Sequence, residues 1–317
     1  MIVLALGLPQ LALAVDKKKK KAMPQGTPVL WRAPDDLPSR DLFLGPGGSE
    51  MKPDLSRVIF VKEEKGGYSK KFRVRDASGR EWVAKIGKEA QSETAAVRLL
   101  WAAGYVTEIN YLVPRLNIEG KGVFENVRLE ARPEKVKRLD EWKWSDNPFV
   151  GTKELQGLIV MMALLNNWDI KDSNNKILVV DGKNGRKELR YEVHDLGASF
   201  GKYSHLPRWI QFKPDRNNPK AYAKTHLVDK VKENGDVRLH YSVKRSDLFK
   251  GISVEDARWL GGLVGRLSQR QIADAFRSAN YSPEQVRLMT EAVAKRVSEL
   301  KSLPANSQLA RRRVRAH

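Results

Sequence analysis

The chain has 317 residues, 41% hydrophobic and 30% charged, which is enough for one large domain or two lobes with a sizeable core. It contains no Cys, so disulfides, thiolate catalysis and cysteine-based metal sites are excluded. Its 58 Lys and Arg residues against 38 Asp and Glu give a formal charge of +20. Such a surface attracts nucleotides, nucleic acids, anionic lipid or acidic proteins, without choosing among them. Part of the excess lies in two runs that are typical of solvated tails, residues 17–21 and 311–315.

The first 14 residues are apolar and end in Ala12-Leu13-Ala14, a small-x-small cleavage pattern. They resemble a secretory signal without its basic start, and they are too short to cross a bilayer. If residues 1–14 are a truncated signal peptide, the protein is periplasmic or secreted; otherwise it is cytoplasmic. The alternative is a disordered or packed N-terminus. No later segment is apolar enough to be a transmembrane helix.

Residues 15–56 are rich in Pro and Gly and predict a linker or a strapped-down extension. From residue 57 to 135 the pattern predicts a small β-rich lobe, with a three-strand meander over residues 58–61, 71–75 and 81–86. A helix is expected from Ser92, as N-cap, to Gly104. Two further strands are expected over residues 111–114 and 123–131.

Residues 136–303 predict a larger, mainly helical lobe, and residues 304–317 a basic tail. A buried helix is expected over residues 152–167 because Leu155, Leu158, Met162 and Leu165 recur at helical spacing. A hairpin should follow, with strands over residues 177–180 and 189–193. Helices are then expected over residues 254–267, 268–279 and 283–300.

One loop after the buried helix carries the most informative polar residues. Asp169, Lys171 and Asn174 stand close together, and Asp195 follows 26 positions after Asp169, beside Gly197. Such a set can supply a base, a cation that neutralises phosphate, and two oxygen ligands for Mg²⁺. A polar turn is the alternative interpretation, since Asp, Asn and Ser favour turns. Asn175 is an alternative to Asn174 if the register shifts by one.

These motifs together resemble the protein-kinase-like fold. Asp169-x-Lys171-x-x-Asn174 is similar to its catalytic loop, residues 194–197 (HDLG) to its metal-binding turn, and residues 83–85 (VAK) to its lysine strand. Short segments such as residues 113–114 (VP) resemble the atypical HipA-type kinases more than ordinary Ser/Thr kinases. The resemblance implies an α+β, bilobal fold with a small antiparallel β-rich N-lobe and a larger helical C-lobe.

The resemblance also implies roles for individual residues. Lys85 would hold the α- and β-phosphates of ATP, oriented by Glu93, for which Glu89 is the competitor. Asp169 would accept the hydroxyl proton and Lys171 would offset phosphoryl charge, while Asn174 and Asp195 would bind Mg²⁺. The incomplete glycine loop, with Gly66, Gly67 and Ser69, would approach the phosphates or be an ordinary hairpin turn.

The sequence therefore predicts an Mg²⁺- and ATP-dependent phosphotransferase whose acceptor is a hydroxyl group, with a protein favoured over a lipid or small molecule. A pseudokinase, which binds nucleotide or acts as a scaffold without turnover, is the first alternative. The second is a basic nucleic-acid-binding protein, which only the net charge supports.

Overall fold

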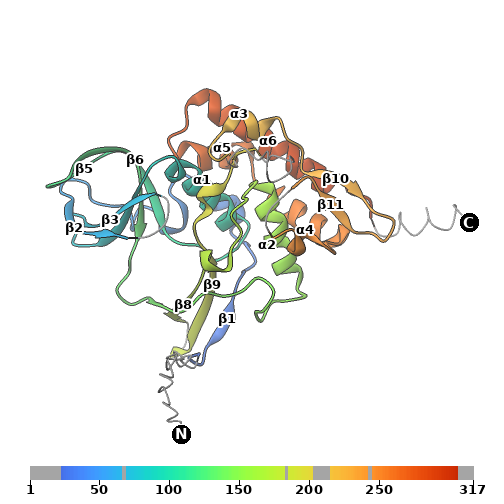
Figure 1. Ribbon diagram of the computed structural model, residues 1–317, viewed down its shortest axis with the longest axis horizontal. Helices are drawn as coiled ribbons and strands as arrows, with labels where there is room; N and C mark the ends of the chain where they lie inside the picture. Colours follow the sequence, from blue (N-terminus) through green and yellow to red (C-terminus); the bar gives the residue numbers. More distant parts are fainter. Residues whose placement is uncertain (1–22, 66–68, 183–184, 203–214, 242–244, 306–317) are drawn as a thin grey trace, which may run out of the picture.

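The computed structural model describes residues 23–65, 69–182, 185–202, 215–241 and 245–305 (Figure 1). The expected signal segment, Gly66, Gly67 and the basic tail from residue 306 onward lie outside these ranges. The first part of the fold is a five-stranded antiparallel sheet in the order β2-β3-β4-β6-β5. Its strands are β2 (Ile59–Glu64), β3 (Lys70–Arg75), β4 (Glu81–Ile86), β5 (Asn110–Ile118) and β6 (Gly122–Ala131).

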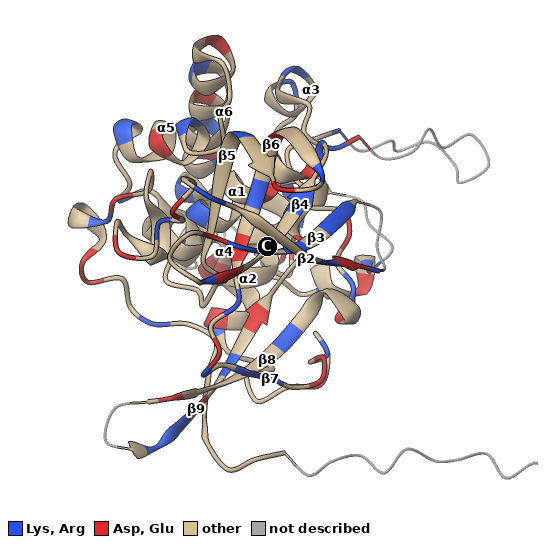
Figure 2. Cartoon of the chain, turned by 90° about the vertical axis from the view of Figure 1, so that its left-hand side faces the viewer, with Lys and Arg blue, Asp and Glu red and all other residues tan. Residues whose placement is uncertain are grey.

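The two faces of this sheet differ in chemistry because side chains alternate along each strand. One face forms a separate hydrophobic core that includes Phe72, Trp82 and Leu129, all buried. The residues between them are largely charged, such as Lys71, Lys85 and Arg128. Figure 2 marks the Lys and Arg positions on the ribbon in blue and the Asp and Glu positions in red. Lys71 pairs with Lys85 in register, and Lys85 pairs with Arg128, so these charges share one face.

Helix α1 (Glu89–Ala102) follows β4 after a sharp turn at Gly87, whose φ of 122° favours glycine. The helix begins three residues before the expected start, so Ser92 lies in its first turn and is not its N-cap. The Ser92 hydroxyl instead donates a hydrogen bond to the backbone oxygen of Gly197, at 2.7 Å. Almost every residue of α1 is buried, because both the sheet and the helical part of the protein pack against it.

The second part is mainly helical and encloses the larger hydrophobic core. Its longer helices begin at Thr or Ser side chains that accept a hydrogen bond from a backbone N–H, as N-caps do. The helices are α2 (Lys153–Leu164), α3 (Pro219–Ala223), α4 (Val254–Val264), α5 (Gln269–Arg277) and α6 (Pro283–Lys301). Within the described ranges, none is long and apolar enough to span a bilayer.

Two smaller sheets complete this part. One has the order β1-β9-β8-β7 and the other is the antiparallel pair β10-β11. Strands β8 and β9 form the expected hairpin, of which residues 183–184 lie outside the described ranges. The strands are β1 (Thr27–Val29), β7 (Lys137–Arg138), β8 (Asn175–Asp181), β9 (Lys187–Val193), β10 (Val228–Val231) and β11 (Val237–Leu239).

The segment before the five-stranded sheet packs against both parts of the protein. Strand β1 pairs with β9 in parallel, and Leu30, Leu37 and Leu42 are each no more than 2% exposed in the larger core. The indole N–H of Trp31 donates to the backbone oxygen of Ala103, just beyond the end of α1, at 2.7 Å. This segment is thus bonded to the C-terminal end of α1 through Trp31, and to β9, the strand that precedes His194, through β1.

Candidate functional site

Lys85 lies at the centre of a cluster of carboxylates. It is in the middle strand of the five-stranded sheet and is 3% exposed. Its ammonium nitrogen lies 2.6 Å from Asp195 Oδ1, 2.9 Å from Glu93 Oε2 and 3.1 Å from Glu89 Oε2. Burial alone would lower the pKa of Lys85, but Glu93 and Asp195 outweigh it and raise that pKa, so the lysine is charged.

Both glutamates proposed as partners of Lys85 contact it. Because α1 begins at Glu89, Glu93 lies one turn further along the same helix face and both carboxylates reach the strand. They differ in their other contacts. Glu89 also accepts a hydrogen bond from Ser69, at 2.6 Å, and pairs with Arg216 from the segment before α3. Glu93 uses its second oxygen, Oε1, to pair with Arg128 at 3.0 Å.

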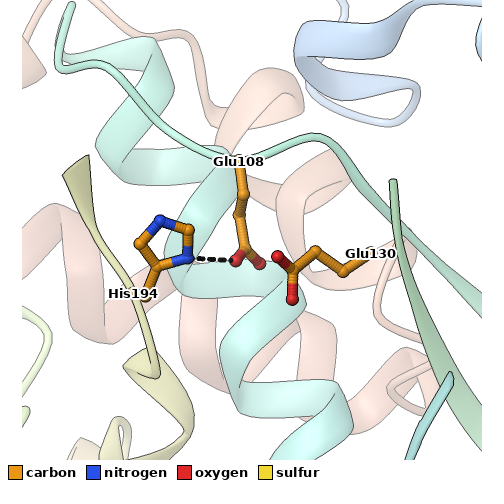
Figure 3. Close-up of side chains that lie close together, drawn as sticks. All are labelled: Glu108, Glu130 and His194. Atoms are coloured by element: carbon orange, nitrogen blue, oxygen red, sulfur yellow. Dashed lines mark hydrogen bonds and ion pairs between the residues drawn. The ribbon is translucent and has the colours of Figure 1, made fainter. Parts of the chain in front are cut away.

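Arg128 extends the cluster into a closed ring of charged side chains. Its guanidinium pairs with Glu93 and with Glu108, and Glu108 in turn lies 3.1 Å from the Nδ1 atom of His194 (Figure 3). His194 precedes Asp195, which pairs with Lys85, so the ring closes. We call six residues the buried ring: Lys85, Glu93, Glu108, Arg128, His194 and Asp195. The side chains of the first five are at most 11% exposed, whereas Asp195, which opens onto the cavity, is 42% exposed.

Opposite charges within the buried ring stabilise His194 and Glu108, whereas burial raises the pKa of Glu93 despite the nearby Arg128 and Lys85. Burial alone would lower the pKa of His194, but Glu108 and Glu192 outweigh it and raise the pKa to about 9. The pKa of Glu108 is well below its usual value, because Arg128 and His194 outweigh the effect of its burial. Although Glu108, Glu130 and His194 approach one another as metal ligands would, Arg128 pairs with both glutamates and supplies the positive charge there.

The loop after α2 places Asp169 beside Lys171 and Asn174. A left-handed residue, Asn166 with φ of 55°, ends the helical turn, and the Asn167 side chain accepts a hydrogen bond from the Asp169 backbone. The Lys171 ammonium lies 2.6 Å from Asp169 Oδ1. The Asn174 amide donates to the Asp169 backbone oxygen at 2.7 Å and to its Oδ2 at 3.4 Å. The structure therefore brings together the three residues predicted from the loop.

Asp195 has an uncommon backbone conformation. Its φ of 55° and ψ of 49° lie in the left-handed region, which Asp tolerates better than most residues. The preceding residue, His194, donates its backbone N–H to the Asn174 oxygen at 2.7 Å, which joins the two polar segments. Burial alone would raise the pKa of Asp195, but Lys85, with Lys71 and Arg128, lowers it, so the carboxylate is ionised.

Lys85, Asn174 and Asp195 meet at one cavity of about 240 Å³ between the sheet and the helical part. Asp169 and Lys171 are not among the lining residues, and Asp169 is connected to the cavity through its hydrogen bond with Asn174. Asn174, rather than Asn175, lines it, because Asn175 is fully buried and donates to the Trp142 backbone. Ser69 is turned toward Glu89 and is not among the lining residues. The lining residues are Lys71, Val83, Lys85, Glu93, Glu108, Arg128, Glu130, Arg132, Arg138, Ser173, Asn174, Lys176, His194 and Asp195.

Sequence reasoning missed half of the buried ring: Glu108, Arg128 and His194. The sequence carries one signal for Arg128, since charged residues alternate with apolar ones along residues 127–131. That alternation normally indicates a solvent-exposed face. Here the face is covered by the helical part, and Arg128 is 2% exposed.

An antiparallel five-stranded sheet, a helix whose glutamate pairs with a buried strand lysine, and a helical second part define a bilobal α+β protein-kinase-like fold. This confirms the fold class predicted from the sequence. No protein-family model matches the chain, and no curated protein matches its sequence significantly.

Three solved structures are among those similar to it. The proinflammatory kinase CtkA of Helicobacter pylori is 12% identical over 81% of this chain and 95% of that chain, with a TM-score of 0.44. The Golgi casein kinase with Mn/ADP bound is 10% identical over 84% and 75%, with a TM-score of 0.39. The Rio2 kinase–ADP/Mg²⁺–phosphoaspartate complex of Chaetomium thermophilum is 10% identical over 77% and 72%, with a TM-score of 0.34. At these TM-scores the similarities carry no argument about the chemistry of this chain.

Proposed function

We propose that this protein is a phosphotransferase that moves the γ-phosphoryl group of ATP to a hydroxyl group, with Mg²⁺ as cofactor. One observation carries the proposal: a single cavity is lined by Lys85, Asn174 and Asp195, and Asn174 is hydrogen-bonded to Asp169. A buried cation, two oxygen ligands and a carboxylate base are the groups that phosphoryl transfer requires from a protein.

Asn174 and Asp195 fit a magnesium ion by the chemistry of their donors. The Asn174 amide nitrogen faces Asp169, which leaves its oxygen as an acceptor for a cation. Asp195 uses Oδ1 for Lys85, and its side chain is 42% exposed, so its carboxylate can be reached from the cavity. Bound Mg²⁺ would neutralise charge on the phosphate oxygens, as it prefers few protein ligands together with phosphate and water.

Asp169 is the group that would receive the acceptor's proton. The bond from the γ-phosphorus to the bridging oxygen breaks as the acceptor oxygen bonds to that phosphorus, the hydroxyl proton passes to Asp169, and ADP leaves. Positioning supplies most of the rate in such a reaction, and Asp169 is held by Lys171 and Asn174. We favour a protein hydroxyl as the acceptor over a lipid or a small molecule.

A pseudokinase is the second candidate, because two observations favour it. Lys85 is already bonded to three carboxylates, and the sheet face above the cavity is charged where a purine base usually meets apolar side chains. Such a protein would bind nucleotide weakly or not at all, and it would transfer no phosphate.

The test is incubation of the purified protein with Mg²⁺ and ATP labelled at the γ-phosphate, with casein added as a general acceptor. We expect label on this protein or on the acceptor, and Asp195→Asn should abolish it. Asp181→Asn, at the exposed end of β8 and outside the cavity, is the matched control and should retain transfer. Equal labelling by the two variants would refute the assignment, whereas thermal stabilisation by ATP without any labelling would identify the pseudokinase.

A further inference from the structure

We propose that Lys71 is the lysine of this site that contacts the polyphosphate of the nucleotide, while Lys85 holds the carboxylates in place. The inference rests on the proposed function, since it concerns the same cavity. Lys71 would thereby take the phosphate-binding role that the resemblance to kinases implies for Lys85.

The position of Lys71 follows from strand pairing. It lies on β3 directly opposite Lys85 on β4, and opposite residues of an antiparallel pair have Cβ atoms about 5 Å apart on the same face. Both side chains line the 240 Å³ cavity, together with Asn174 and Asp195. A phosphate group bound near the metal ligands would therefore meet both lysines.

The ammonium of Lys85 is already compensated by three carboxylates. It donates hydrogen bonds to Glu93 and Asp195 and forms an ion pair with Glu89 at 3.1 Å. A phosphate oxygen that approached Lys85 would have to compete with these three carboxylates for its charge. Two of them, Glu89 and Glu93, are no more than 6% exposed, so losing the cation would leave a buried carboxylate with less compensation.

Lys71 has the opposite character. It is half-buried, and no carboxylate of the described residues lies within ion-pair distance of its ammonium group. The acidic residue opposite it on β2, Glu64, is paired with Arg73 at 2.7 Å. Placing two lysines opposite each other is unfavourable by itself, so an anion between them would stabilise the pair.

The ligand that suits this cation is a chain of phosphates. An ammonium group is a compact point charge that binds phosphate oxygens without demanding one orientation. Affinity should therefore depend on the number of phosphates and not on the base, so adenosine should be indifferent to Lys71. Inorganic tripolyphosphate should respond to the loss of Lys71 as ATP does.

The experiment compares Lys71→Met with Lys70→Met, which removes the same charge from the neighbouring residue. Lys70 points to the opposite face of the sheet, where its ammonium lies 4.9 Å from the centre of the Phe72 ring. Binding of Mg·ATP, tripolyphosphate and adenosine is measured by calorimetry at one fixed salt concentration. We expect Lys71→Met to weaken Mg·ATP and tripolyphosphate about tenfold and adenosine not at all, since a hydrogen bond to a charged group has about this effect.

Lys70→Met should bind all three ligands as the unaltered protein does, and Lys71→Arg, which keeps the charge, should retain most of the affinity. If Lys71→Met and Lys70→Met bind Mg·ATP equally well, the role of Lys71 is refuted while the proposed function stands. Equal weakening by the two variants would also refute it, because a general effect of net charge would then explain the loss. If the unaltered protein binds no nucleotide, the proposed function fails and this inference fails with it.

Discussion

Replacing Arg128 by Met tests whether the buried ring holds the two parts of the protein together. Arg128 pairs with Glu93, Glu108 and Glu130, and all four side chains are at most 7% exposed. Removing one partner of a buried ion pair costs about 3–5 kcal/mol, because a charge is left without compensation. Here each carboxylate keeps another partner: Glu93 has Lys85, Glu108 has His194, and Glu130 has Arg138.

We therefore expect a loss near the lower limit, about 3 kcal/mol in the free energy of unfolding. At about 2.1 cal/mol/K per residue, the unfolding entropy of 317 residues is about 0.7 kcal/mol/K, so this loss corresponds to a fall of about 4–5 °C in Tm. The assay is thermal unfolding followed by circular dichroism. The loss should be nearly the same at low and high salt, because buried pairs are little screened.

The matched control is Arg115→Met, which makes the same substitution on β5 at an exposed position. It should change the free energy of unfolding by no more than about 0.5 kcal/mol. If Arg128→Met unfolds at the same temperature as Arg115→Met, the ring does not stabilise the fold and the reasoning is wrong. A loss that disappears in high salt would show that the pairs are solvated.

Three further predictions concern other parts of the fold. Gly197→Ala should lower the free energy of unfolding by about 1–3 kcal/mol, because the new Cβ would lie 2.6 Å from Glu89 Cβ. Urea unfolding measures this loss, and an unchanged urea midpoint would contradict the close packing of α1 on this turn. Leu42→Ala should cost about 2–5 kcal/mol in the same assay, since Leu42 is 1% exposed, and a cost below about 0.5 kcal/mol would mean that the N-terminal segment is not part of the core. Burial alone would raise the pKa of Asp76, but hydrogen bonds from Ser78 and Trp82 outweigh it and lower that pKa in the folded protein. The ionised carboxylate therefore contributes its full stabilisation above about pH 4, the pKa of an unfolded Asp, and this stabilisation is lost as the pH falls through the lower pKa of the folded state. Asp76→Asn should therefore be less stable at pH 7, and the difference from the unaltered protein should be smaller at pH 3; an equal difference at both pH values would contradict this.

The sequence predicted those features that depend on local order along the chain. Alternating side chains indicated the strands of the first sheet, and the spacing of Asp169, Asn174 and Asp195 indicated one polar site. The structure brings Asn174 and Asp195 to the same cavity and leaves their roles as proposals. The expected helix start at Ser92 is wrong, and the earlier start at Glu89 lets both Glu89 and Glu93 pair with Lys85.

The remaining features depend on contacts between distant residues, which a single sequence does not reveal. Glu108 and His194 are 86 positions apart, and Arg128 is 35 positions from Glu93. Each of these residues alone resembles a solvated surface charge. Only the packing of the helical part over the sheet makes them buried partners.

The N-terminal segment also sets the order in which the protein can be completed during synthesis. Gln271 donates hydrogen bonds to the backbone oxygens of Leu37 and Arg40, which lie 234 and 231 positions before it. At about 5–20 residues per second, the ribosome needs roughly 10–50 seconds to make the chain between these partners. Residues 37–40 are thus made long before their partner in α5, and the backbone oxygens of Leu37 and Arg40 stay without these hydrogen bonds until α5 has emerged.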